Sequence, residues 1–114
     1  MIFDQFDVVI SAFPFVEVPG GVKRPVLVLS KFDRFGSETG IGLTAMVTTA
    51  KNSAWPFDVP VADLEIAGLR QPCFIRMKFG SIAFERVDRK IGVLSERDRA
   101  AVRKSLQSVL GGAI

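Results

Sequence analysis

The chain has 114 residues, of which 48% are hydrophobic and 24% are charged, a composition typical of a folded globular protein with one core. It contains no histidine and one cysteine, which excludes an internal disulfide framework and a structural zinc site built from Cys and His. Residues 1–69 carry five basic and eight acidic side chains (−3), whereas residues 70–114 carry ten and four (+6), giving the net +3. This asymmetry favours an anionic partner, although a solvated basic face is its commoner cause.

Length and termini predict one domain over residues 1–114 in the cytoplasm. The chain opens MIFDQFD, with acidic residues where a secretory leader needs cations, and no apolar run approaches the length of a membrane span. Cys73 lies inside an apolar run, so we expect a small buried core residue and not a nucleophile.

Short segments rich in β-branched and aromatic residues predict most of the chain to be strand. Bounded by Gly, Pro, Asp or Ser, these segments are residues 7–13, 25–30, 42–49, 73–79, 81–84 and 90–94. The punctuated segments 32–40 and 51–60 are predicted loops. Many short strands followed by one terminal helix predict a mainly β fold, a small barrel or coiled antiparallel sheet with a C-terminal α-helix.

The helix is predicted from residue 95 onward. Ser95 is the expected N-cap, Asp98 follows three residues later as in a capping box, and Gly111-Gly112 provide the stop. One face of the predicted helix is apolar, with Val102, Leu106, Val109 and Leu110, and the opposite face carries Arg99, Arg103 and Lys104.

The stretch GGVKRPVLVLS, residues 20–30, places two cations in front of a buried strand. Gly20 and Gly21 permit backbone conformations that other residues avoid, whereas Pro25 holds Arg24 extended. Arg24 therefore has a fixed base next to a mobile segment. Its planar, permanently charged guanidinium suits a phosphate or a developing phosphorane charge. The alternative is an ordinary surface turn with solubilising charge.

Two further segments carry groups suited to binding nucleic acid. AMVTTAKN, residues 45–52, ends a strand in two threonines followed by Lys51 and Asn52, so a hydroxyl can donate to a phosphate oxygen; threonine also fits strands for steric reasons alone. In SAWPFDVPV, residues 53–61, Trp55 and Phe57 straddle a proline, as do Phe13 and Phe15 earlier in the chain. Loop aromatics beside cations are stacking platforms for single-stranded bases, or they cover the end of a barrel.

Taken in order, these motifs resemble the MazF/PemK toxin family over nearly the whole chain. FDVVISAFPF is similar to the family's opening strand, GGVKRPVLVLS to its Arg-Pro-aliphatic signature, and VTT to its strand end. WPFDVPV occupies the place of a Leu-Pro-x-x-Val segment, and IGVLSERDRAAVRKSLQSVLG resembles the terminal linker and helix.

The resemblance implies an SH3-like barrel, a homodimer and a toxin of a type II toxin–antitoxin pair. The implied activity is a metal-independent endoribonuclease on single-stranded mRNA, without a cofactor, in which the ribose 2′-hydroxyl attacks the adjacent phosphate to leave a 2′,3′-cyclic phosphate. Catalysis is expected from Arg24 and Thr48. RNA binding is expected from Lys23, Thr49, Lys51, Asn52, Trp55, Arg76 and Lys78. A cognate acidic antitoxin is expected to cover the basic surface of residues 70–104, and the Gly20-Gly21 loop to gate the RNA channel.

The chain departs from the family at two places. The glycine that precedes the first strand is Phe6, and the later strand, Met77 to Ile82, lacks the acid proposed as general base in some members. The usual basic residue before Ser81 is also missing, and Arg76 could serve as a substitute cation. Lys78 would act as a base only with a strongly lowered pKa. These departures keep two alternatives open: a CcdB-like toxin that binds DNA gyrase without catalysis, and an inactive nucleic-acid- or peptide-binding module.

Overall fold

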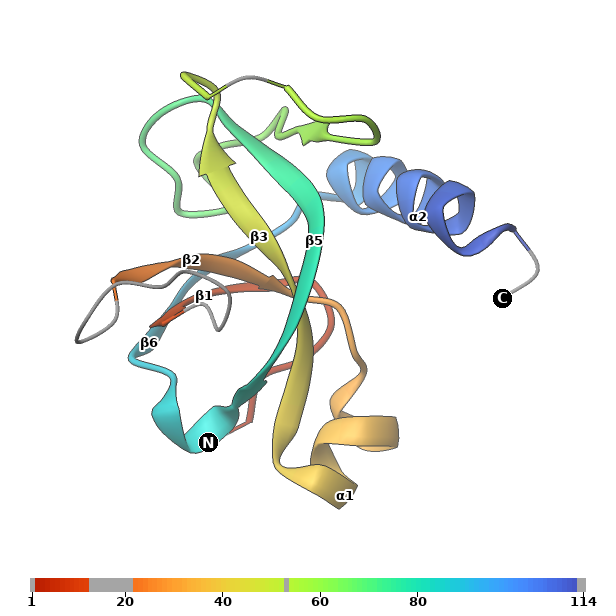
Figure 1. Ribbon diagram of the computed structural model, residues 1–114. Coiled ribbons are helices and arrows are strands. Elements are labelled where there is room, and N and C mark those ends of the chain that lie inside the picture. Colours follow the sequence, from red (N-terminus) through yellow and green to blue (C-terminus); the bar gives the residue numbers. More distant parts are fainter. Residues whose placement is uncertain (1, 13–21, 53, 113–114) are drawn as a thin grey trace.

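The computed structural model describes residues 2–12, 22–52 and 54–112. It contains β1 (Asp7–Ala12), β2 (Lys23–Val28), β3 (Ile41–Thr49), β4 (Val59–Pro60), β5 (Cys73–Ala83), β6 (Arg89–Val93) and the helix α2 (Glu96–Leu110). The strands form one antiparallel sheet in the order β4-β5-β3-β2-β1-β6. β3 and β5 are long and twisted and cross over β1 and β2, so the sheet curls on itself (Figure 1). The prediction of a mainly β fold with a C-terminal helix is confirmed.

Alternate residues of each strand point to opposite sides of the sheet, and each side carries a cluster of buried residues. One core cluster includes Leu27, Val47 and Ile75 and receives Val102 from the helix. The other cluster, on the opposite face, includes Val26, Met46 and Phe84. The central strands therefore read as continuous apolar runs and not as polar–apolar alternation.

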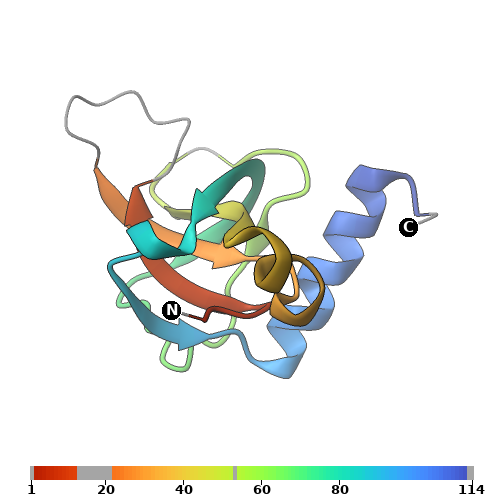
Figure 2. The same ribbon diagram turned by 90° about the horizontal axis from the view of Figure 1, so that it is seen from below.

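The helix begins where the sequence predicts, but its flanking contacts differ. The Ser95 hydroxyl accepts the N–H of Asp98 at 3.3 Å, and Gly111 ends the helix with a left-handed φ of 86°. The Asp98 carboxylate does not complete a capping box; it accepts the N–H groups of Ala62 and Asp63, each at 2.9 Å. The C-terminal half of α2 extends away from the sheet (Figures 1 and 2). Consequently Val109 and Leu110 are exposed, although they were predicted on the apolar face.

The polar face of the helix is only partly solvated. The guanidinium carbons of Arg99 and Arg103 lie 5.5 and 4.9 Å from the centroid of the Phe6 ring. Phe6 is buried and has a φ of 72°, in the left-handed region that favours glycine, at the position where the resemblance expects a glycine. Here a phenylalanine adopts that conformation, and its ring packs in the core beneath two cations.

Three segments differ from the predicted elements. β5 is continuous through Gly80 and not two strands, because Gly80 pairs with Thr44 and its carbonyl accepts the Thr44 hydroxyl at 2.7 Å. β4 lies inside the predicted loop 51–60. The predicted loop 32–40 contains a turn of π-helix, Phe32–Gly36, and the short α1, Ser37–Thr39.

Candidate functional site

Arg24 and Thr48 lie at the same end and on the same face of the sheet. The paired register of β2 and β3 ends at Val26–Met46, and both residues lie two positions beyond that pair, in the same direction. Since side chains alternate along a strand, Arg24 and Thr48 share the face of Val26 and Met46. The two residues predicted to act on one phosphate therefore lie on one face of two adjacent strands, just beyond the end of their paired register.

Two further residues continue this line across the sheet. Ser11 pairs with Arg24 on the β1 side, and Phe74 pairs with Thr48 on the β5 side. We call Ser11, Arg24, Thr48 and Phe74 the strand-end row. Ser11 is buried, and Arg24 is half-buried one pair before the end of the β1–β2 ladder, which fixes the base of its side chain.

The hydroxyl of Thr48 is oriented by Asn52. Asn52 follows a tight turn, in which its N–H donates to the Thr49 carbonyl at 3.1 Å. Its side-chain amide then donates to Thr48 Oγ1 at 2.7 Å. Because the amide is the donor, the hydroxyl hydrogen of Thr48 is left to donate to another acceptor, such as a phosphate oxygen. Thr48 is 5% exposed, so its hydroxyl is held in place by packing as well.

A buried ion pair lies in the next line across the sheet. Arg76 pairs with Met46 and so shares the face of the strand-end row. Its Nε and Nη2 donate to the two carboxylate oxygens of Asp58 at 3.2 and 3.0 Å, and the two side chains are 8% and 4% exposed. This forked geometry neutralises both charges inside the protein.

Trp55 and Lys78 adjoin this ion pair. The guanidinium carbon of Arg76 lies 4.7 Å, and the Lys78 ammonium 5.9 Å, from the centroid of the Trp55 ring. Lys78 is placed there by a bulge: Met77 and Lys78 have no partner on β3 between the pairs Arg76–Met46 and Phe79–Ala45. Trp55 is exposed, a condition that a stacking residue must meet.

Other predicted RNA-binding residues lie elsewhere. Lys23 precedes Arg24 on β2, so its side chain points to the opposite face of the sheet. Its ammonium forms an ion pair with Asp88 at 3.1 Å, and hydrogen bonds from Lys23 and then Arg89 lower the pKa of the Asp88 carboxyl. Thr49 is on the opposite face from Thr48 and lines a separate hollow of about 420 Å³ with Pro25 and Cys73. Both residues are thus separated from the strand-end row by the sheet.

The remaining predictions have mixed outcomes. Lys51 is exposed in the turn after β3. Cys73 is buried, which confirms the predicted core residue, and burial raises the pKa of its thiol. Within residues 2–12, 22–52 and 54–112, no group of three His, Cys, Asp or Glu side chains is arranged to hold a metal ion. The predicted gate at Gly20 and Gly21, and Phe13 and Phe15, lie outside the described residues.

Sequence reasoning missed Ser11 and Asp58. Ser11 follows from the hairpin register once β1 and β2 are aligned, so the alternation of the two predicted strands contained the signal. Asp58 lies in a segment that reads as a loop, and only the pairing of β4 with β5 brings it opposite Arg76. No local pattern in the sequence indicates that pairing.

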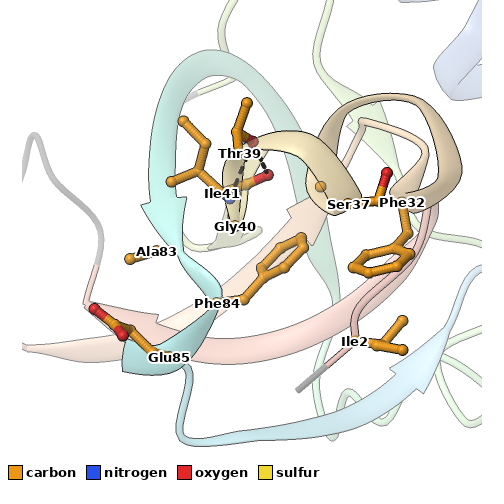
Figure 3. Close-up of a pocket in the computed structure, with 10 residues that line it drawn as sticks. Ile2, Phe32, Ser37, Thr39, Gly40, Ile41, Ala83, Phe84 and Glu85 are labelled. Carbon is orange, nitrogen blue, oxygen red and sulfur yellow. Dashed lines mark hydrogen bonds between the residues drawn. The ribbon is translucent and has the colours of Figure 1, made fainter.

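A hollow of about 620 Å³ lies at the other end of β3 (Figure 3). Its walls include Phe32, Phe84 and Ile2, and the Thr39 hydroxyl accepts the N–H of Ile41 at 3.2 Å on its rim. It contains none of the predicted site residues. Among the described residues, no helix has both the length and the apolar character needed to cross a membrane.

The chain is similar to several solved toxin structures over nearly its whole length. It matches MazF of a MazE–MazF complex from Deinococcus radiodurans (Form-II) with 26% identity and a TM-score of 0.72, covering 97% of each chain. It matches the Deinococcus radiodurans MazF structure (Form-I) with 25% identity and a TM-score of 0.74, covering 97% and 98%. For the Mycobacterium tuberculosis toxin MazF-mt6, the identity is 20% and the TM-score 0.70, covering 92% and 96%, a likeness that shows the fold.

Membership in a family is shown by the sequence itself. None of the curated proteins matches the chain. Residues 4–110, however, match the family described as the PemK-like, MazF-like toxin of type II toxin–antitoxin systems, and this match spans every described strand and the helix. The chain therefore belongs to the PemK/MazF toxin family of type II toxin–antitoxin systems.

Proposed function

We propose that this toxin is a metal-independent endoribonuclease that cleaves single-stranded mRNA by attack of a ribose 2′-hydroxyl on the adjacent phosphate. The observation that carries the proposal is the placement of Arg24 and Thr48 at one end and on one face of the sheet. Endoribonuclease activity is also the description of a structurally similar mycobacterial protein, solved with its cognate antitoxin.

The two residues divide the work of phosphoryl transfer. In the pentacoordinate transition state the phosphoryl oxygens gain charge, which the Arg24 guanidinium stabilises through paired N–H donors. Thr48, oriented by Asn52, donates its hydroxyl to a second oxygen and fixes the phosphate for in-line attack. The 2′-oxygen forms a bond to phosphorus as the P–O5′ bond breaks. The 2′-hydroxyl proton passes to water and the departing 5′-oxygen takes a proton from water, which leaves a 2′,3′-cyclic phosphate and a 5′-hydroxyl. No group in this scheme requires imidazole.

Asp58 is not assigned proton transfer in this scheme. Its carboxylate accepts two hydrogen bonds from the Arg76 guanidinium and one, at 2.8 Å, from the backbone N–H of Trp55. Both of its oxygens are thus already engaged by donors within the protein. Asp58 supports the site by holding its neighbours.

We also infer a homodimer and a cognate acidic antitoxin, both in the cytoplasm, where mRNA is translated. Exposed apolar side chains on α2 and the adjacent loop, namely Phe57, Val109 and Leu110, provide a surface for a second copy. Structures of MazF with MazE from Deinococcus radiodurans support an antitoxin partner for this chain. The basic residues of the 70–104 segment favour an acidic one.

The test is cleavage of a single-stranded transcript by the purified toxin in EDTA, with the new ends mapped. Cyclic phosphate ends from the wild type, and intact RNA with Thr48→Val, are expected, because valine keeps the shape of threonine and removes the hydroxyl. Intact RNA at high concentrations of folded wild type would refute the proposal. Inhibition of gyrase supercoiling without RNA cleavage would instead establish a CcdB-like mode of action.

A further inference from the structure

We propose that Asp58 is a positioning residue of the RNA-binding face, which holds the Trp55 indole as a platform for one unpaired nucleobase. The inference rests on the proposed function in that it takes single-stranded RNA as the ligand. The inference assigns a role to Asp58, which the sequence did not single out. It also assigns one stacked base to the Trp55 ring, next to the strand-end row.

The first step is the fixed place of Asp58. Val59 pairs with Ile75 and Pro60 with Phe74, so Asp58, one residue before β4, stands opposite Arg76 on β5. The two side chains are almost fully buried, and both carboxylate oxygens accept bonds from the guanidinium. Burying two charges is costly, and it is offset only where geometry and hydrogen bonding are complete, as they are for this carboxylate. The pair is therefore a rigid link between the loop before β4 and the central sheet.

The second step joins Trp55 to that link. Asp58 Oδ2 accepts the backbone N–H of Trp55 at 2.8 Å, and the Asp58 N–H donates back to the Trp55 carbonyl at 3.2 Å. The Arg76 guanidinium, held by the same carboxylate, lies 4.7 Å from the centroid of the indole ring. Asp58 thus fixes both the backbone that carries the ring and the cation that packs against it.

The third step concerns what such a ring can bind. Trp55 is 48% exposed, so a large part of an immobilised aromatic surface faces solvent. An indole polarised by nearby cations, next to residues that bind phosphate, is the arrangement on which single-stranded bases stack. Arg76 shares the face of Arg24 and Thr48, which places the ring on the side of the sheet where the phosphate is expected. A stacked base typically contributes about ten- to one-hundred-fold in affinity.

Trp55 gives a direct signal for this contact, because the chain has one tryptophan and no tyrosine. The probe is a short single-stranded RNA with 2′-O-methyl groups, which blocks attack, together with a series in which each base in turn is removed to leave an abasic site. Binding of the intact probe is expected to quench the wild-type fluorescence. One abasic position is expected to abolish the quenching and to weaken binding about tenfold or more. Quenching that no abasic position alters would overturn the platform.

Asp58→Asn is expected to shift the emission of Trp55 and to remove most of the difference in affinity between the intact and abasic probes. Asp58→Glu keeps the charge and is expected to restore at least half of that difference. The control is Asp63→Asn, which removes the carboxylate of the exposed Arg97 pair and should leave both readouts unchanged. Wild-type discrimination in Asp58→Asn would overturn the positioning role. If that variant does not fold, equal affinities of folded Asp58→Glu for the two probes would overturn it, and retained discrimination would support it.

The readout is independent of cleavage, so the two proposals fail separately. A wild type that binds the probe with base-dependent quenching, but leaves unmodified RNA intact, refutes the endoribonuclease and supports the platform. A wild type that cleaves RNA, without any base-dependent quenching, supports the endoribonuclease and refutes the platform.

Discussion

Two Arg–Asp pairs of similar forked geometry lie in different regions of this toxin. Arg76 and Asp58, in the strand-end region, are 8% and 4% exposed, whereas Arg97 and Asp63, in the region where the helix begins, are 70% and 32% exposed. The exposed pair has the shorter bonds, 2.8 and 2.7 Å against 3.2 and 3.0 Å. The lengths of the hydrogen bonds therefore do not indicate which pair contributes more to stability.

The burial of the side chains indicates which pair is more costly to break. Removing one partner of a buried pair leaves a charge without solvent, whereas water and salt replace the lost partner of an exposed pair. The strand-end region therefore concentrates its charges where they hold one geometry, next to the residues proposed to act on RNA. The helix-start region uses the same chemistry to tie a loop to a helix at the surface.

The largest contrast between the two regions is expected in catalysis. Arg24→Ala should lower the cleavage rate at least about a thousandfold, since it removes the cation that stabilises the transition-state charge. Arg97→Ala, an equal loss of charge in the helix-start region, should leave the rate within about twofold. Single-turnover cleavage of a labelled RNA measures both. Comparable losses in the two variants would show that net charge, and not the placement of Arg24, governs activity.

The next contrast is in stability. Asp58→Ala should lower the free energy of unfolding by about 3–5 kcal/mol, because the buried Arg76 guanidinium would lose both of its bonds to the carboxylate. Asp63→Ala should cost a small fraction of that, because its partner Arg97 is mostly exposed. Urea unfolding followed by circular dichroism compares the two. Equal shifts in midpoint would contradict the ranking by burial.

The two regions also differ in how much of their structure could be predicted from the sequence. The positions of Arg24 and Thr48 at strand ends were predictable, because each adjoins a strand whose apolar pattern is plain. Their catalytic roles follow from the family resemblance and stay a prediction. The mainly β fold and the helix cap at Ser95 follow from similar local signals. Such features depend on residues close together in the chain.

The supporting contacts were not predictable, because they join segments that are distant in the chain. Asp58 reaches Arg76 across 18 residues, and Asp98 reaches the Ala62 N–H across 36. The bulge that brings Lys78 toward Trp55 depends on the register between β3 and β5. Lys23 and Thr49 were assigned to the site from proximity in sequence, although alternation along a strand turns each away from its neighbour.

A third experiment asks whether the helix-start region has a buried anchor of its own. Asp98 is buried, and its carboxylate holds the N–H groups of Ala62 and Asp63. Asp98→Ala should cost about 1–3 kcal/mol of unfolding free energy by leaving these donors without partners, while RNA cleavage by the folded variant is unchanged. Asp98→Asn, which keeps one acceptor oxygen, should lose less. A loss of cleavage with full stability would place Asp98 in the functional region and weaken the distinction.

The smallest effect expected is the pH dependence of the exposed pair. Hydrogen bonds from Arg97 and then from Ser95 lower the pKa of Asp63 from 3.8 to about 2. A carboxyl with a lowered folded-state pKa stabilises the protein above its unfolded-state value and loses that contribution as pH falls toward the folded-state value. The difference in urea midpoint between wild type and Asp63→Asn should therefore be constant from pH 7 to about 4.5, narrow below about pH 4, and disappear only as the pH falls through the folded-state pKa of about 2.

High salt should narrow the same difference at neutral pH, because the pair is open to solvent and its attraction is screened. The matched experiment on Asp58→Asn should show little dependence on salt, since its carboxylate is out of contact with the ions. A salt response of equal size in both variants would mean that solvent reaches Asp58 and Arg76 in solution. In that case the rigid link beneath Trp55, and with it the difference between the two regions, would not hold.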